Sequence, residues 1–176
     1  MLRFHCVVPT DHYGFYMIWD SDAKFRHDSK TIEPVMPCYN SIIVNAPIEK
    51  VWEAVRDFHR MDWGQPFITS CKAIGDVAGD QVGAKRVLNG AFEETLQELD
   101  ETRFRIAYSI DNGPEPVSQD TVSSYVGAIK LLPVTSDDTT FVQWTAEYQT
   151  EDPQLVADFC NPIYAALLAS LHDHFS

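Results

Sequence analysis

The strongest constraint on the fold of this chain is a run of strand-like segments enclosed by two helical ones. Six such segments, rich in β-branched and aromatic residues, lie at about 67–75, 83–88, 91–99, 103–110, 120–132 and 139–149. Short turn sequences separate them, of which Asn89-Gly90 is the strongest hairpin signal. Consecutive strands joined by such short links predict an antiparallel sheet.

Apolar residues at helical spacing indicate one helix on each side of these strands. A short strand at 41–44 leads into a helix over 47–58, and a longer helix begins near Pro153. The longer helix contains Pro162, which predicts a kink or a break. Its apolar stripe consists of Val156, Cys160, Tyr164, Leu167 and Leu171. We therefore expect an α+β domain in which a long C-terminal helix covers one face of a curved antiparallel sheet.

The length of 176 residues fits one domain with an extension. Residues 1–38 are rich in Pro and Asp, which favour turns and loops, although 14–19 have the composition of a short edge strand. We interpret 1–38 as an N-terminal extension of uncertain order and 39–176 as the folded domain.

The charge balance excludes several classes of partner. The chain has 13 Lys and Arg against 26 Asp and Glu, a net charge of −13, whereas nucleic acids and anionic membranes require a cationic surface. No apolar run reaches the roughly 18 residues of a membrane span, and the first residues lack the pattern of a secretory signal. We expect a cytoplasmic protein without membrane insertion.

The sequence contains no pattern typical of a metal or cofactor site. Four cysteines and six histidines are scattered without zinc or redox spacing, and there is no phosphate-binding glycine loop or dinucleotide fingerprint. No serine or cysteine lies in a nucleophile motif. We expect no metal and no cofactor, and we leave open whether the chain forms a homodimer.

An ordered series of segments carries a resemblance to a known family. The series comprises Ala46-Pro47, Val51-Trp52, Asp57-Phe58, Trp63, 82–86, 94–100, 104–110, Pro116-Val117, 125–127 and 140–144. It resembles the START-like helix-grip superfamily (SRPBCC), in particular its MxaD-like and polyketide cyclase/dehydrase branch, over about 39–175. The resemblance implies a sheet wrapped around the last helix, with a cavity between them. Members bind apolar or amphipathic ligands there, and some cyclise or dehydrate polyketides.

The hairpin at Asn89-Gly90 predicts a charged pair in this cavity. A two-residue turn places Lys85 opposite Glu94, on the face marked as inner by Val87, Phe92 and Leu96. In the family that this chain resembles, the Glu of a Glu-x-Leu pattern also lines the cavity. A slip of one residue would instead select Arg86 and Glu93.

The remaining candidate ligand-binding residues are aromatic or lie on the helix stripe. Tyr and Trp combine an apolar body with one polar tip, which can orient the oxygen atoms of a ligand. The candidates are Trp63 and Phe67 at the entrance, Val87, Phe92 and Glu94 on the hairpin, Tyr108, Tyr125 and Trp144 on later strands, and Val156, Cys160 and Tyr164 on the helix.

Three functions remain open at this point. The leading hypothesis is the binding of a small apolar or amphipathic molecule. The alternative is a polyketide cyclase or dehydratase that uses Glu94, with Lys85 or a tyrosine, for acid–base chemistry. The third is an accessory protein whose interior is simply packed.

We predict that deleting residues 1–30 leaves a folded, cooperative domain, because their composition favours loops over core. The measurement is thermal unfolding of the truncated and full-length chains, followed by circular dichroism. A large loss of thermal stability would mean that residues 15–19 form a true strand of the sheet.

Overall fold

The computed structural model describes residues 38–176, so the strand predicted at 14–19 lies outside the described residues. The elements in chain order are β1 (Tyr39–Val44), α1 (Ile48–Val55), the 3-10 turn η1 (Asp62–Gly64), β2 (Cys71–Ile74), β3 (Lys85–Leu88), β4 (Phe92–Asp100), β5 (Arg105–Asn112), β6 (Val122–Val134), β7 (Thr139–Thr150) and α2 (Pro153–His174). All the predicted elements within 38–176 are present.

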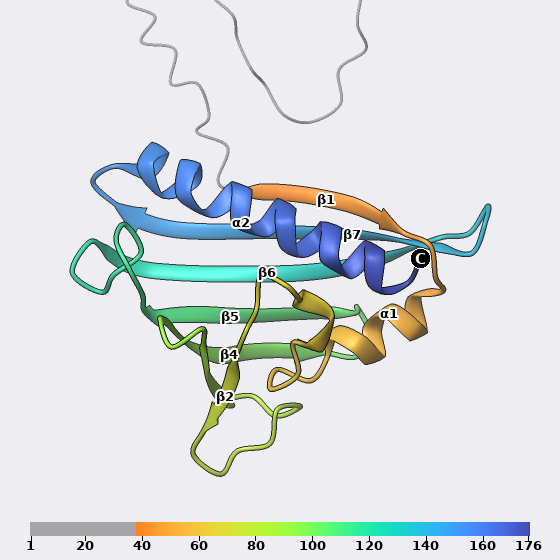
Figure 1. The fold of residues 1–176 in the computed structure, drawn as a ribbon, viewed down its shortest axis with the longest axis horizontal. Helices are drawn as coiled ribbons and strands as arrows, with labels where there is room; N and C mark the ends of the chain where they lie inside the picture. The colour runs from red at the N-terminus through yellow and green to blue at the C-terminus, as the bar shows by residue number, and fades with distance from the viewer. Residues whose placement is uncertain (1–37) are drawn as a thin grey trace, which may run out of the picture. The chain divides into compact units, whose positions relative to one another are not determined.

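The seven strands form one antiparallel sheet in the order β1-β7-β6-β5-β4-β3-β2. Neighbours from β2 to β7 are consecutive in the chain, as the hairpin links predict, and β1 pairs with β7. The sheet curves, and α2 runs across one of its faces (Figure 1). The predicted α+β helix-grip fold is confirmed.

The helix α2 provides the centre of the core. All five residues of its predicted stripe, from Val156 to Leu171, are at most 5% exposed. The helix continues through Pro162 without the predicted break. A proline inside a helix costs about 3 kcal/mol, but each buried Leu or Val side chain contributes about 1.5–3 kcal/mol, so burial of the stripe outweighs that cost.

By length and apolar composition α2 also meets the criteria for a membrane span, but its apolar stripe is buried inside the domain.

Two boundaries differ from the sequence prediction for identifiable reasons. Phe104 has a left-handed backbone (φ 49°), so the turn before β5 extends through it and β5 begins at Arg105. The segment predicted as a strand over 67–75 forms a strand only from Cys71 to Ile74. Before it, Phe67, Thr69 and Ser70 bond to the side chain of Asn89 instead of a strand.

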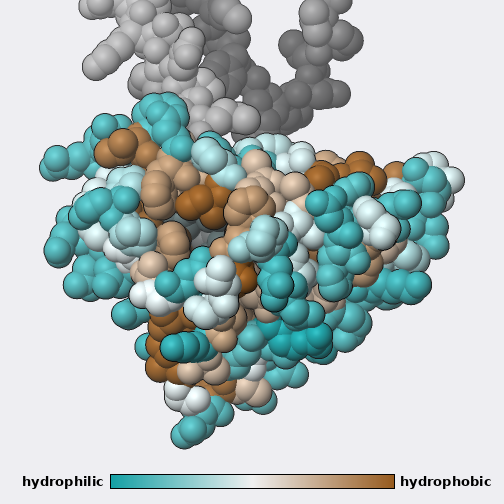
Figure 2. Space-filling model, in the orientation of Figure 1, coloured by the Kyte–Doolittle hydropathy of each residue, from teal (hydrophilic) through white to brown (hydrophobic). Residues whose placement is uncertain are grey.

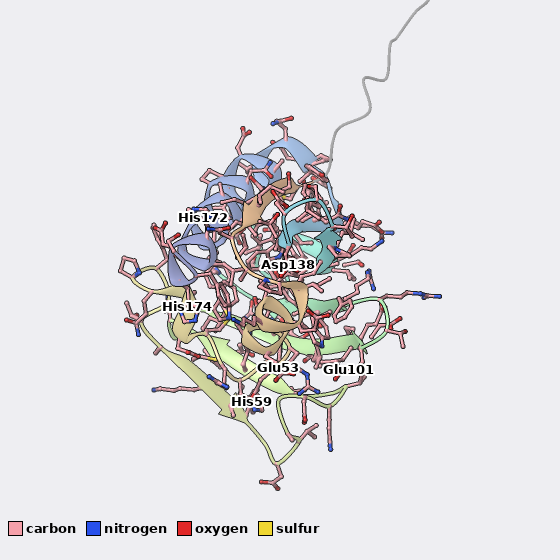
Figure 3. The ribbon with its side chains drawn as sticks, turned by 90° about the vertical axis from the view of Figure 1, so that its right-hand side faces the viewer. Glu53, His59, Glu101, Asp138, His172 and His174 are labelled. Carbon is pink, nitrogen blue, oxygen red and sulfur yellow. The ribbon has the colours of Figure 1, made fainter. Side chains whose placement is uncertain are left out.

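A carboxylate after β4 holds α1 against the sheet. Glu101 accepts a hydrogen bond from Nε1 of Trp52 (2.6 Å) and forms an ion pair with Arg56. Figure 3 shows Glu101 beside α1. Trp52 also packs edge-on against Phe104, with 5.7 Å between ring centroids. These contacts hold α1 against the turn between β4 and β5.

Side chains of α2 bond to the outer edge of β1 at both of its ends. The amide N–H of Tyr39 donates to Oδ1 of Asn161 (3.1 Å), which also accepts from Asn40 Nδ2 (2.8 Å). Near the other end of the strand, Nδ1–H of His172 donates to the carbonyl of Ile43 (2.9 Å). Unpaired edge strands are templates for association, so these contacts both fix α2 and protect the edge.

We predict that Asn161→Ala lowers the free energy of unfolding by about 1 kcal/mol, because two partly exposed hydrogen bonds are lost. The measurement is urea unfolding, together with hydrogen exchange of the Tyr39 amide, which should become faster. Gln154→Ala is the control, since Gln154 lies on the same helix and bonds only to the exposed Asp158. Equal stability of the two variants would contradict the proposed role of Asn161.

Candidate functional site

A pocket of about 320 Å³ lies between the sheet and α2. In the space-filling view, this face of the molecule is hollowed, and apolar side chains gather around the hollow (Figure 2). Strands β3 to β7, α2 and the loop before β2 all contribute to its wall. The lining residues are Phe67, Ile68, Arg86, Leu88, Asn89, Phe92, Glu94, Tyr108, Ile110, Tyr125, Trp144, Cys160, Pro162, Ile163, Tyr164, Ala166 and Leu167.

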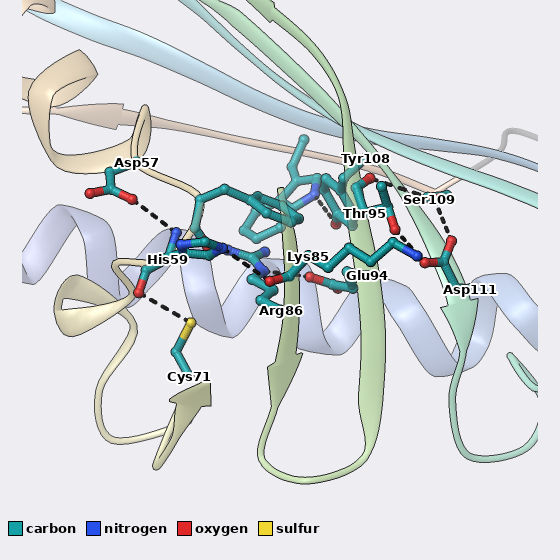
Figure 4. A network of polar contacts seen from close by, with 12 residues as sticks. Asp57, His59, Cys71, Lys85, Arg86, Glu94, Thr95, Tyr108, Ser109 and Asp111 are labelled. Atoms are coloured by element: carbon teal, nitrogen blue, oxygen red, sulfur yellow. Dashed lines mark hydrogen bonds and ion pairs between the residues drawn. The ribbon is translucent and has the colours of Figure 1, made fainter. Parts of the chain in front are cut away.

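One buried ion pair makes up the charged part of this lining. Nε of Arg86 donates to Oε2 of Glu94 at 2.7 Å, and the two side chains are 4% and 6% exposed. Arg86 also donates from Nη1 to the carbonyl of Phe58 (2.8 Å), and its guanidinium lies 3.8 Å from the centre of the Phe58 ring. Figure 4 shows this arrangement. Arg86 therefore ties β3 and β4 to the segment that follows α1.

Burial raises the pKa of the Glu94 carboxyl, and the charge and hydrogen bond of Arg86 offset part of that shift. Glu94 Oε1 and Arg86 Nη2 have no hydrogen-bond partner within residues 38–176, and both residues line the pocket. The pair thus presents one acceptor atom, Oε1, and one donor atom, Nη2, that have no partner in the described chain.

The hydroxyl, indole N–H and thiol groups of five lining residues form one chain of hydrogen bonds between the sheet and α2. Nε1 of Trp144 donates to Tyr108 OH (2.9 Å), which donates to Tyr164 OH (3.2 Å). Tyr164 and Tyr125 share a hydrogen bond of 2.6 Å, and Tyr125 OH donates to Cys160 Sγ (3.3 Å). Each of these groups has a partner within the protein, so the aromatic part of the lining requires no polar group from a ligand.

Burial raises the pKa of Tyr108, Tyr125 and Tyr164. Their hydroxyls therefore stay protonated at any physiological pH. They act as hydrogen-bond donors and acceptors, not as bases.

A glycine makes room for the central tyrosine. Gly127 pairs with Tyr108 across β5 and β6, and a Cβ atom at position 127 would lie 2.4 Å from Cζ of Tyr108. No real contact is that short, so Tyr108 can lie flat over β6 only because residue 127 has no side chain.

The predicted pairing of Lys85 with Glu94 is wrong. The loop contains three residues, 89–91, so that Leu88 pairs with Phe92, Arg86 with Glu94 and Lys85 with Thr95. This shift moves Lys85 and Val87 to the outer face, where Lys85 is exposed, and brings Arg86 inward. The alternative pair of Arg86 with Glu93 is also absent, because Glu93 is exposed opposite Val87.

The structure brings most of the other predicted residues together. Those that line the pocket are Phe67, Phe92, Glu94, Tyr108, Tyr125, Trp144, Cys160 and Tyr164. Trp63, Val156 and Val87 do not line it: Trp63 and Val156 are buried elsewhere in the core, with Trp63 6.4 Å from Trp144 between ring centroids.

Sequence reasoning offered Arg86 only as the alternative produced by a one-residue slip, and it missed Leu88, Ile110 and the α2 residues Ile163 and Ala166. A signal for the first two was available, because Ala84, Arg86 and Leu88 alternate along the chain.

The side chain of Asn89 holds the mouth of the pocket together. Its Oδ1 accepts hydrogen bonds from the amides of Thr69 (2.8 Å) and Ser70 (3.2 Å), and its Nδ2 donates to the carbonyl of Phe67 (2.9 Å). The tip of the β3–β4 hairpin is therefore attached to the loop before β2, and the 52% exposed Phe67 stands at the opening.

Within residues 38–176, no group of three or more His, Cys, Asp or Glu side chains is placed to hold a metal ion.

Comparisons with known proteins agree with this architecture. The family model described as "polyketide cyclase / dehydrase and lipid transport" matches residues 38–175. A structure from Nitrosospira multiformis is 46% identical, with a TM-score of 0.76, and the match covers 78% of this chain and 94% of that one. The XoxI protein of Bacillus cereus is 22% identical, with a TM-score of 0.66 and coverage of 80% and 95%, which shows a shared fold. No curated protein matches the sequence.

We predict that Arg86→Met lowers the free energy of unfolding by about 3–5 kcal/mol, because it leaves the Glu94 carboxylate buried and unpaired. Lys85→Met, one residue away on the exposed face, should change it by less than about 0.5 kcal/mol. The measurement is urea unfolding. Similar losses in both variants would contradict the assignment of Arg86 as the partner of Glu94.

The pH dependence of Arg86→Met follows from the same pair. Without the guanidinium, burial and the charge of Asp111 both raise the folded pKa of Glu94, and nothing offsets them. The folded state then binds its proton more tightly than the unfolded state, so stability falls as pH rises. The loss should be smallest below the unfolded pKa of about 4.3 and should grow toward neutral pH. A difference from wild type that shrinks as the pH rises over this window would contradict the role of Glu94.

Proposed function

The chain belongs to the polyketide cyclase/dehydrase and lipid transport family, and from this premise we propose that it binds a small apolar or amphipathic molecule in the pocket between the sheet and α2. The observation that carries the proposal is the combination of lining groups. Apolar walls surround a single ion pair that has one free acceptor and one free donor. Ligand sites typically consist of such an apolar cavity with a few placed polar groups.

The volume supports a compact ligand. At the roughly 30 Å³ that a water molecule occupies in the liquid, 320 Å³ corresponds to about ten to eleven non-hydrogen atoms. Pockets that bind small molecules measure about 300–1,000 Å³, so this one lies at the lower end of the range. A short acyl chain or a single fused ring system fits, and a full-length phospholipid does not.

A second candidate function is acid–base catalysis of the cyclase or dehydratase type. The observation that favours it is Glu94, a carboxyl in the pocket lining whose pKa is raised by burial. Lys85 is exposed on the outer face and is not a partner for it, so the proton donor in such a reaction would be one of the lining tyrosines, whose hydroxyls already bond to one another. Arg86 already occupies one oxygen of Glu94, and this favours binding over proton abstraction.

The two candidates differ in what Glu94→Gln does. This variant keeps the shape of the side chain and removes its charge. Under the binding function it changes which ligands are preferred, and under the enzymatic function it abolishes turnover. Native mass spectrometry of the protein purified from its own host identifies the bound molecule. A molecule that wild type converts and Glu94→Gln leaves unchanged would support the enzyme.

We predict that Ala166→Phe abolishes binding of an uncharged fluorescent probe, 1-aminonaphthalene, because Ala166 lines the pocket and the added ring fills it. Ala165→Phe is the matched control, since Ala165 is the preceding residue on α2 and is exposed. The measurement is a fluorescence titration of both variants and wild type. If wild type does not bind the probe, or if the two variants bind it equally, the pocket is not the binding site.

A further inference from the structure

We propose that the pocket selects molecules whose polar end is an uncharged hydroxyl group and rejects carboxylates and amines of the same length. This inference rests on the proposed binding function and adds the chemical class of the ligand. It is carried by the arrangement of the Arg86–Glu94 pair, whose two side chains are almost fully buried and line the pocket.

The charges at the polar end disfavour an anion. Arg86 supplies one positive charge and Glu94 one negative charge, so the charged part of the lining has no net charge to attract an anion. A ligand carboxylate that approached Arg86 would meet the Glu94 carboxylate 2.7 Å from the same guanidinium. Like charges in a buried site repel strongly, because the surroundings screen them little. The net charge of −13 on the whole chain also disfavours an anionic ligand.

A cation is disfavoured by the other member of the pair. An ammonium group that reached the free oxygen of Glu94 would lie beside the guanidinium of Arg86, which already neutralises that carboxylate. The remaining lining is mainly apolar, so the lost hydration of the ammonium would not be replaced.

A hydroxyl group fits both unused positions at once. It can donate its proton to Oε1 of Glu94 and accept a hydrogen bond from Nη2 of Arg86, the two groups without a partner in the described chain. The polar atoms of the chain that runs from Trp144 through three tyrosines to Cys160 already hydrogen-bond to one another. They need no polar group from the ligand. The rest of the ligand can therefore be hydrocarbon.

The test compares three ligands of equal chain length, 1-decanol, decanoate and decylamine, near neutral pH. Each displaces 1-aminonaphthalene from the protein, and its dissociation constant follows from the competition curve. Their size of about eleven non-hydrogen atoms matches the pocket volume. We expect wild type to bind 1-decanol at least about tenfold more tightly than either charged ligand.

Glu94→Gln removes the negative charge of the pair, so we expect it to bind the anionic ligand better than wild type does. It leaves the Arg86 guanidinium without a counter-charge, so decanoate should gain at least about tenfold in affinity relative to 1-decanol. Glu93→Gln is the matched control, because Glu93 is the preceding residue and is exposed on the opposite face. It should keep the ranking of wild type. If circular dichroism shows that Glu94→Gln does not fold, the ranking in wild type decides.

The outcomes separate this inference from the function on which it rests. Binding of decanoate or decylamine by wild type as tightly as 1-decanol would overturn the selectivity and leave the binding function standing. An unchanged ranking in folded Glu94→Gln would also overturn it. If neither the fluorescent probe nor any of the three ligands binds, the proposed function is wrong and the inference falls with it.

Discussion

One helix has to cover a sheet that is much wider than itself. Seven strands at about 4.8 Å spacing span roughly 29 Å, whereas a helix with its side chains is only about 10–12 Å across. A flat sheet would leave most of one face exposed to water, so the sheet curves around α2, and α1 with the residues after it covers part of the remainder (Figure 1). Contact along the apolar stripe of α2 is close, and the space that the curvature leaves beside it is the pocket.

Most polar side chains of the pocket lining hydrogen-bond to one another. Three tyrosines, a tryptophan and a cysteine satisfy one another in a single chain of hydrogen bonds, and Gly127 gives Tyr108 the room to take part. Arg86 connects three separate parts of the chain. Buried polar groups are costly when they are left unpaired, so a chain that is complete in itself lets the pocket remain mostly apolar.

Sequence reasoning was most successful where burial has a clear period. The stripe of α2 repeats over five residues, and the inward positions Phe92, Glu94 and Leu96 on β4 alternate strictly, so both were predictable. The partner of Glu94 could not be predicted in the same way. Asn-Gly is typical of a two-residue turn, but here Ala91 joins the loop, and a shift of one residue exchanges the two faces of β3. Val156 and Trp63 show a second limit, because periodicity identifies buried residues but cannot tell which of them face empty space.

The hydrogen bonds of Asn89 have a consequence for how fast molecules exchange with the interior. They join the tip of the hairpin to the loop before β2, so hydrogen bonds hold these two segments of the rim together. Motions of whole loops take nanoseconds to microseconds, whereas exposed side chains change rotamer within picoseconds to nanoseconds. We therefore expect entry of the proposed ligand to depend on rotation of the half-exposed Phe67 side chain more than on the opening of a loop.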